Sequence, residues 1–213
     1  MSVTFSDLAT AAYCPRQLYY ARRDDDRGPP AAVRERQRLA FRYPDLRAAG
    51  TVPDAVAVPP ATYRERLERL AERDDWDRLV AADRRVRLEG KDCHGIAHKV
   101  LAEPPVPSVV SPGEPPDSGV WHPQRVRAVA TAKALAWERE RPVDRALVEY
   151  PAHGVVRTVR LTTRAKAAYR RTLRTVRRTD GVPPRIDDRS KCAACAYREE
   201  CGVRTRSLRS MLF

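Results

Sequence analysis

Three cysteines stand close together near the C-terminus, where Cys192, Cys195 and Cys201 form a C-x2-C-x5-C spacing. A fourth, Cys14, lies near the other end of the chain, directly before Pro15. Thiolates bind soft or borderline metals, and four of them complete a tetrahedral zinc site or hold an iron–sulfur cluster. We expect these four thiols to bind such a centre and to tie the two ends of the chain together. Ordinary buried, reduced thiols are the alternative.

The division of the four cysteines into three and one favours a cubane iron–sulfur cluster, because structural zinc sites usually combine two close pairs. The fifth cysteine, Cys93, precedes His94 in a predicted strand or turn, where we expect an ordinary half-buried thiol. The residues after Met1 show no basic region followed by an apolar run, so we expect no signal peptide and a cytoplasmic protein. Reducing conditions there favour metal binding over disulfides.

The chain of 213 residues is strongly basic, with a formal net charge of +13. Its hydrophobic content of 42% is enough to build a core, and no apolar run is long enough for a transmembrane helix. A charge of this size favours a nucleic-acid partner over a membrane, since no amphipathic basic anchor is evident. A solvated basic surface without a partner is the alternative.

One predicted helix, 162–178, concentrates this charge. Its arginines recur at spacings that keep four of them on one face: Arg164, Arg171, Arg174 and Arg178. Such a row can neutralise phosphates with little reading of sequence, so we expect a DNA-binding face. A solvated face balanced by the acids of 65–77 is the alternative. Aromatic residues that could stack on bases, although their spacing is equally typical of a core, are Trp121, Tyr43 and Tyr169.

Hydrophobic periodicity and turn residues predict a mixed α/β sheet in an α+β arrangement. Predicted helices are 4–20 with a break at Pro15, 34–46 with a break at Pro44, 61–80, 123–140 and 162–178. Predicted strands are 85–88, 96–101 and 106–111 as an antiparallel meander, then 146–150 and 155–161; residues 50–60 form a strand or loop. We expect one domain, 1–213, with a mainly helical part (1–80), a mixed core (81–180) and a cysteine module (181–213).

Four stretches give the chain a resemblance to a known family. They are Ser6-Asp7-Leu8 through Tyr13-Cys14-Pro15-Arg16-Gln17-Leu18-Tyr19, then Gly95-Ile96-Ala97-His98-Lys99-Val100, then Gly119-Val120-Trp121-His122-Pro123, and the terminal cysteines. Together they resemble the fourth family of CRISPR-associated proteins, RecB-like exonucleases of the PD-(D/E)XK superfamily. The resemblance implies a restriction-endonuclease-like core and a 4Fe-4S cluster on Cys14, Cys192, Cys195 and Cys201. It also implies single-stranded DNA or DNA ends as partner, a divalent metal for cutting, and work beside the CRISPR integrase in antiviral defence.

The chain departs from that family at the nuclease site. The family has an Asp closing a Gly-x-x-Asp strand, where this chain has His98. It has Glu-x-Lys on the next strand, where Val109 and Ser111 stand, and a Gln early in the following helix, where Arg127 stands. Magnesium and manganese prefer carboxylate oxygens, so we assign no catalytic residue and expect the nuclease activity to be lost or much reduced.

Nuclease activity would survive if residues at other positions replaced the missing catalytic groups. Candidates near the predicted strands and helix are Asp92, Glu103, Glu114 and Lys133. If such carboxylates faced His98 in one cleft, an active, manganese- or magnesium-dependent single-stranded DNA exonuclease in spacer acquisition would be the better reading. A zinc-binding nucleic-acid-binding protein is a second alternative. Our prediction is a DNA-binding, iron–sulfur protein of this CRISPR-associated type.

Overall fold

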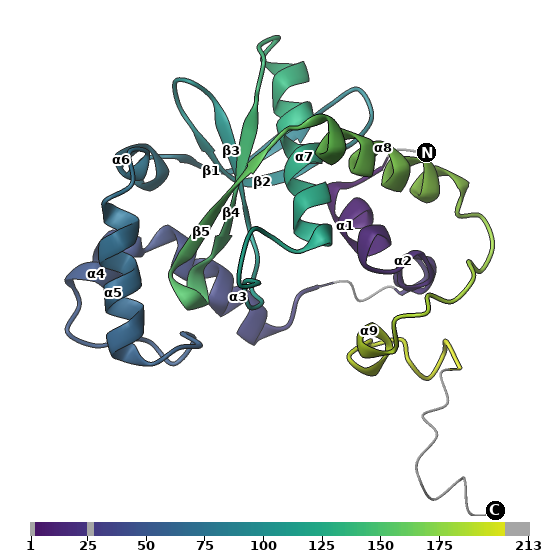
Figure 1. Cartoon of the computed structure of the whole chain (residues 1–213), viewed down its shortest axis with the longest axis horizontal. Coiled ribbons are helices and arrows are strands. Elements are labelled where there is room, and N and C mark those ends of the chain that lie inside the picture. The colour runs from purple at the N-terminus through teal and green to yellow at the C-terminus, as the bar shows by residue number, and fades with distance from the viewer. Residues whose placement is uncertain (1–2, 25–27, 203–213) are drawn as a thin grey trace, which may run out of the picture.

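The computed structural model of the protein describes residues 3–24 and 28–202, which form a mixed five-stranded sheet flanked by helices (Figure 1). The strands lie side by side in chain order, and every neighbouring pair is antiparallel except β3 and β4, which are parallel. They are β1 (Asp83–Glu89), β2 (His94–Leu101), β3 (Val106–Val110), β4 (Arg145–Tyr150) and β5 (Val155–Arg160). The predicted mixed α/β sheet and its antiparallel meander are confirmed.

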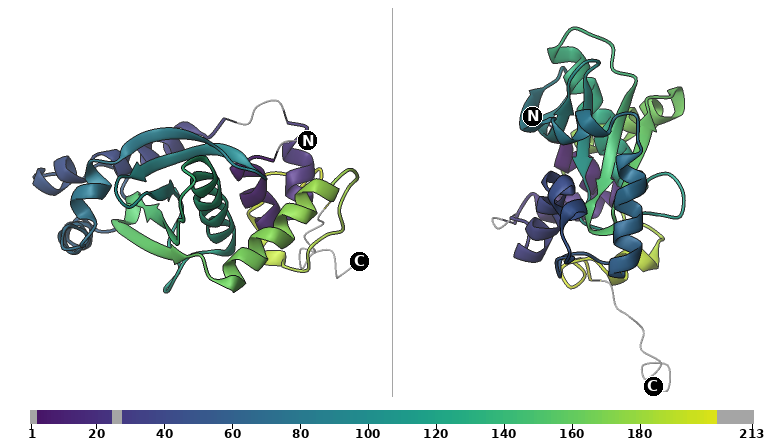
Figure 2. Two further views of the ribbon diagram at one scale, coloured as in Figure 1. Left: turned by 90° about the horizontal axis from the view of Figure 1, so that it is seen from above. Right: turned by 90° about the vertical axis from the view of Figure 1, so that its left-hand side faces the viewer.

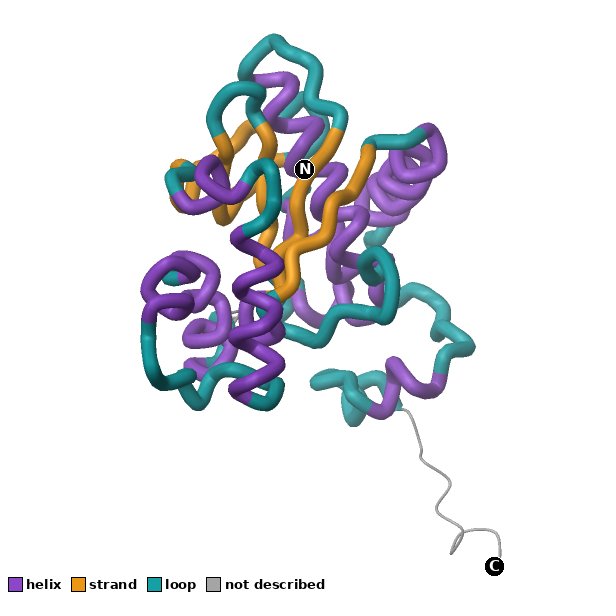
Figure 3. Tube along the Cα trace, turned by 60° about the vertical axis from the view of Figure 1, so that its left-hand side comes forward, coloured by secondary structure: helices purple, strands orange, loops and turns teal. Residues whose placement is uncertain are grey.

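Helices cover both faces of the sheet, and Figure 3 shows the strands gathered as one layer between them. Before the sheet come α1 (Phe5–Tyr13), α2 (Pro15–Ala21), α3 (Ala31–Arg38), η1 (Leu39–Phe41), α4 (Tyr43–Ala48), α5 (Pro60–Ala71) and α6 (Trp76–Val80). Later come α7 (His122–Glu138), η2 (Pro151–His153), α8 (Thr163–Arg178) and α9 (Arg189–Ala193). Among the described residues, no helix combines the length and apolar character needed to cross a membrane.

Two hydrophobic cores fill the space between these layers. One joins α1, α7 and α8 to one face of the sheet, and the other joins α4, α5 and α6 to the opposite face. Figure 1 shows these two sets of helices on the right and the left of the sheet. The backbone at Gly90 approaches α7 so closely that a Cβ there would lie 2.7 Å from Ala134 Cα. The alanine-rich face of α7 therefore allows this helix to pack directly onto the sheet.

Local sequence explains most element boundaries. Thr4 Oγ1 accepts a hydrogen bond from the Asp7 N–H at 2.9 Å, which caps α1, and Pro15 starts α2 after the predicted break. The prediction that Pro44 breaks a helix is wrong. Pro44 lies in the first turn of α4, where the backbone N–H groups have no helical partner, so its missing N–H removes no hydrogen bond. Residues 50–59 contain no strand, and α5 begins at Pro60.

The C-terminal segment folds back onto the start of the chain. Of the predicted cysteine module, 181–213, residues 181–202 lie within the described part of the chain, and they consist of a linker, α9 and the turns around it. In Figure 1 this module lies below α2, at the end of the molecule away from α5 and α6, and the views in Figure 2 agree. The fold thus brings the two ends of the described chain together.

Candidate functional site

Four of the five cysteines line a single pocket between α2 and the cysteine module. Cys14 has an extended backbone and lies between the end of α1 and Pro15, the first residue of α2. Cys192 belongs to α9, and Cys195 and Cys201 lie in the turns that follow. All four thiols are free and partly buried. The structure therefore brings together all four cysteines that the spacing predicted as ligands.

The thiols of this pocket share one electrostatic environment. Burial raises the pKa of Cys195, a hydrogen bond with the backbone near Tyr197 lowers it, and the charges of Cys14, Cys201 and Cys192 raise it further. A cationic centre would relieve the mutual repulsion of the thiolates. The donor set has the chemistry that zinc and iron–sulfur clusters take. Within 3–24 and 28–202, no three His, Cys, Asp or Glu groups form a ready-made site for a metal ion.

Polar and aromatic contacts hold the cysteine module against α1 and α2. The Tyr13 hydroxyl donates to the Lys191 carbonyl at 3.2 Å, and the Tyr20 hydroxyl donates to the Glu200 carbonyl at 3.1 Å. The ring of Tyr20 also stacks on that of Tyr197, with centroids 6.0 Å apart. The ends of the chain are therefore joined by contacts that do not depend on a metal.

A groove adjoins the cysteine pocket and shares Gln17 and Tyr197 with it. Its lining residues come from α1, α2, α3, η1, β1, β2 and α7, and from the turn after Cys195. Four arginines line it: Arg34, Arg38, Arg85 and Arg127. No carboxylate in the described part of the chain pairs with any of these four guanidinium groups.

Two carboxylates lie in the same groove, and both have partners. Asp7 Oδ2 accepts a hydrogen bond from Arg22 Nη2 at 2.9 Å, and Asp24 Oδ2 accepts one from the Tyr197 hydroxyl at 2.9 Å. The groove is therefore positive overall, which suits the phosphate backbone of a nucleic acid. Phe41 and Ile96, the latter 44% exposed, add apolar surface to the same walls.

His98 lines this groove at the point where β2 stops pairing with β3. The β2–β3 pairing ends at Lys99 and Ser108, and His98 Nδ1 accepts the N–H of Val110 at 3.1 Å. Burial and, after it, the positive charges of Arg127, Arg85 and Lys99 together lower the pKa of His98 to about 3. The imidazole is therefore neutral at pH 7, and every charge that shifts it is a cation.

The structure also places the other residues at which the resemblance implies a nuclease site. Val109 is buried in the hydrophobic core under α7. Ser111 is buried too, and its Oγ accepts a hydrogen bond from Gln124 Nε2 at 3.3 Å. Arg127 lines the groove beside His98. This part of the groove thus carries an imidazole and a guanidinium instead of the carboxylates that bind magnesium or manganese.

Comparison with known proteins gives no family for this chain. No protein-family model matches it, and no curated protein matches it significantly. The candidate sites therefore rest on the residues of the chain itself.

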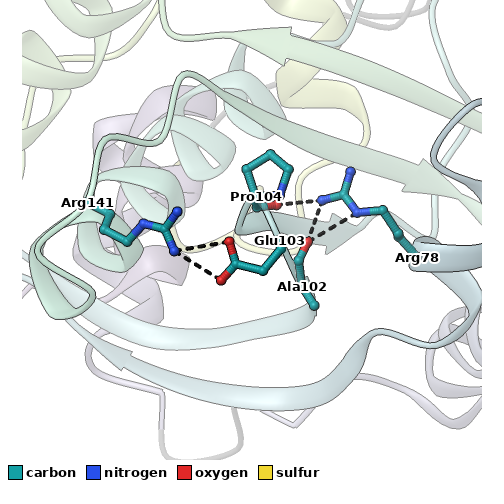
Figure 4. A network of polar contacts seen from close by, with 5 residues as sticks. All are labelled: Arg78, Ala102, Glu103, Pro104 and Arg141. Atoms are coloured by element: carbon teal, nitrogen blue, oxygen red, sulfur yellow. Dashed lines mark hydrogen bonds and ion pairs between the residues drawn. The ribbon is translucent and has the colours of Figure 1, made fainter.

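None of the carboxylates proposed as replacements lines the groove. Asp92 Oδ1 accepts a hydrogen bond from Arg177 of α8 at 3.0 Å. Glu103 accepts from Arg141 at 3.0 Å in the turn between β2 and β3, as Figure 4 shows. Glu114 lies in a separate hollow beside His153 and Arg157. Lys133 Nζ lies over the Tyr169 ring, 5.9 Å from its centroid. The groove has no relocated metal ligand from this set.

The basic face of α8 is exposed. Arg164, Arg171, Arg174 and Arg178 lie on the solvent side of the helix, and the opposite side is buried through Ala165, Tyr169, Leu173 and Val176. Figure 1 shows α5 and α6, which carry half of the acids of 65–77, on the opposite side of the sheet from α8. The other three acids line a hollow that reaches Thr162 at the start of α8, and no ion pair in the described part of the chain joins any of the six to the four arginines. Tyr43 and Tyr169 are core residues, whereas Trp121 is 51% exposed. Cys93 is buried, with its Sγ 3.5 Å from the Tyr169 hydroxyl.

Sequence reasoning missed a buried ionic cluster beneath the sheet. Lys99 Nζ donates to Glu149 Oε2 at 2.9 Å, and Ser108 Oγ donates to Glu149 Oε1 at 2.6 Å. The Lys99 ammonium also lies over the rings of Tyr43 and Phe41. The sequence does indicate this pair, because Lys99 and Glu149 have opposite charges and each interrupts an otherwise apolar strand. The Lys99, Ser108 and Glu149 side chains are buried, so the cluster lies inside the core.

Proposed function

We propose that the protein binds single-stranded DNA in the arginine-lined groove and holds a 4Fe-4S cluster on Cys14, Cys192, Cys195 and Cys201. It has the core of the PD-(D/E)XK superfamily and the descent of the fourth CRISPR-associated family, acting beside the integrase, but its nuclease activity is lost. The observation that carries this proposal is the composition of the groove, whose arginines have no carboxylate partner among residues 3–24 and 28–202.

The groove supports DNA binding through charge and shape. Its unpaired guanidinium groups can each neutralise a phosphate, and Phe41 and Ile96 offer apolar surface to sugars and bases. Single-stranded binding without sequence preference uses this combination of a basic channel and apolar contacts. The exposed arginines of α8 form a second basic surface on which the same strand could continue.

The loss of nuclease activity follows from the charges around His98 in the groove. A divalent cation needs oxygen ligands there, and His98 and Arg127 supply none. The field at His98 comes from Arg127, Arg85 and Lys99, which would repel a metal ion. We therefore expect no metal-assisted hydrolysis of a phosphodiester at this position, because the ligands for the metal are missing.

The cluster proposal is supported by four soft donors, from distant parts of the chain, that line one pocket. When bound, an iron–sulfur cluster would supply a covalent crosslink between α2 and the cysteine module. The residues of the chain already orient both sides, through Tyr13 and Tyr20 against the backbone of the module. Tyr197, which lines both pocket and groove, couples the order of the module to the shape of the DNA site.

Anaerobic purification followed by a visible spectrum and assays for iron, sulfide and zinc tests the cluster. We expect iron and sulfide in about equal amounts, as a cubane cluster requires. A colourless protein containing zinc would favour the zinc-binding alternative. Digestion of end-labelled single-stranded DNA with manganese should give no products, and robust cutting that chelation abolishes would overturn the loss of activity.

Fluorescence anisotropy with labelled single-stranded DNA tests the groove. Replacing Arg34 and Arg38 together by Ala should weaken binding about tenfold and reduce its salt dependence, because two phosphate contacts are lost. The matched control replaces Arg87 and Arg139, which are exposed but lie outside the groove. Equal losses in both double variants would show that only the net charge matters. A loss confined to an Arg171→Ala, Arg174→Ala variant would move the DNA to α8.

A further inference from the structure

Arg127 is a cation without an anion. Its Nε is buried and has no hydrogen-bond partner, and no carboxylate among the described residues pairs with its guanidinium. Burial lowers the pKa of Arg127 to about 10, with no opposing contribution from a neighbouring acid. The residue as a whole is partly exposed and lines the groove, so an anion in the groove can reach its guanidinium. An unpaired charge that is partly withdrawn from water is unfavourable, and an anion would offset that cost.

Arg85 brings a second guanidinium to the same place through an unusual backbone. It lies in β1 between the pairs Arg84–Lys99 and Val86–Ala97, a position opposite His98, and its φ is +55°. The left-handed region is uncommon for a residue with a side chain, and in a strand it is strained. The Arg85 side chain lines the groove and acts electrostatically on His98.

His98 supplies a neutral donor between these two cations. Because its Nδ1 accepts the Val110 N–H, the hydrogen of the neutral ring is on Nε2. No acceptor within the described residues takes that N–H. Three side chains, from β1, β2 and α7, therefore line the groove with donors that no acceptor in the described part of the chain takes.

We infer that the part of the groove around His98 is a phosphate subsite, in which Arg127, Arg85 and the Nε2–H of His98 hold one phosphate of the bound strand. A phosphate supplies the negative charge that Arg127 lacks and accepts from all three groups. The inference rests on the proposed binding of single-stranded DNA and makes that function more specific. The position where a nuclease would hold a cation thus binds the anionic backbone directly.

The test uses the full-length protein purified anaerobically, with Arg127→Met as the main variant. Methionine keeps the apolar length and removes the unpaired charge, so the free protein should melt at a higher temperature while its affinity for single-stranded DNA falls about tenfold or more. The slope of log K against log salt should drop by about 0.7, the value for one phosphate contact on a single strand. Inorganic phosphate should raise the melting temperature of the wild type but not of the variant.

Two comparisons keep the outcome decisive. Arg85→Met, at an exposed position with little risk to folding, should also lose affinity and the phosphate effect, whereas Arg87→Met, on the same strand but outside the groove, should lose neither. If Arg127→Met and Arg85→Met bind DNA like the wild type, the subsite is refuted and the proposed function stands. If the wild type binds phosphate through Arg127 but no DNA, the proposed function and the assignment of the subsite to a strand both fail.

Discussion

Lys99 on β2 and Glu149 on β4 form an ion pair across β3, with Lys99 Nζ 2.9 Å from Glu149 Oε2 and both side chains at most 3% exposed. Both charges are withdrawn from water, so each depends on the other for compensation. Lys99 directly follows His98 in β2, so its ion pair with Glu149 holds β2, β3 and β4 in register next to the groove.

Removing one member of this pair should destabilise the protein strongly. Glu149→Gln keeps the shape and the contact with Ser108 but leaves the Lys99 ammonium buried without an anion, at a cost of about 3–5 kcal/mol. The double variant Lys99→Met, Glu149→Gln should recover most of that loss. Urea denaturation of the two single variants and the double variant measures the coupling, and additive losses would show that the two charges do not interact.

Loss of one cysteine ligand should loosen the join between the ends of the chain. Cys195→Ser should release iron and visible absorption and lower the melting temperature, because binding energy of a metal centre is also folding energy. Limited proteolysis should then cut within the cysteine module first. Cys93→Ala, at a thiol outside the pocket, is the control and should keep its iron. An unchanged spectrum in Cys195→Ser would remove this residue from the ligand set.

The stability of the protein should fall in mild acid, and His98 should cause part of the fall. The folded pKa of His98 is about 3, below the ordinary value of 6.5, so between these values the unfolded state binds the additional proton. The free energy of unfolding therefore decreases as the pH falls from 6.5, by at most about 1.4 kcal/mol per pH unit from this group.

His98→Gln tests this assignment, because its side chain does not titrate and still offers an acceptor to the Val110 N–H. Urea denaturation between pH 8 and pH 5.5 should show a shallower pH dependence in the variant. Burial also lowers the pKa values of His122 and His153, so some dependence should remain. A slope identical to that of the wild type would mean that His98 does not contribute.

Relief of backbone strain at Arg85 should stabilise the fold and weaken DNA binding together. Arg85→Gly allows the φ of +55° without a clash and should raise the free energy of unfolding by about 1 kcal/mol. It also removes a guanidinium from the groove. The Arg87→Gly variant has an ordinary strand backbone, so it should lose stability instead. A destabilised Arg85→Gly with full affinity would contradict both the strain and the role in binding.

The sequence by itself determined what depends on neighbours along the chain. Thr4 caps α1, Pro15 separates α1 from α2, and the spacing of apolar residues in 162–178 places its arginines on one exposed face. Strand positions followed from period-two patterns and turn residues, which gave the mixed sheet. The spacing of the cysteines also indicated a shared site, because closely spaced thiols are typical of zinc and iron–sulfur ligands.

Only the tertiary structure decided which charges meet. Lys99 and Glu149 come together through β3, and Arg85, His98 and Arg127 come together from β1, β2 and α7. Whether an arginine is paired, solvated or buried alone depends on contacts between segments far apart in sequence, and local periodicity carries no information about them. For the same reason the carboxylates proposed near His98 turned out to pair with Arg177 and Arg141, because strand pairing and helix packing direct them away from the groove.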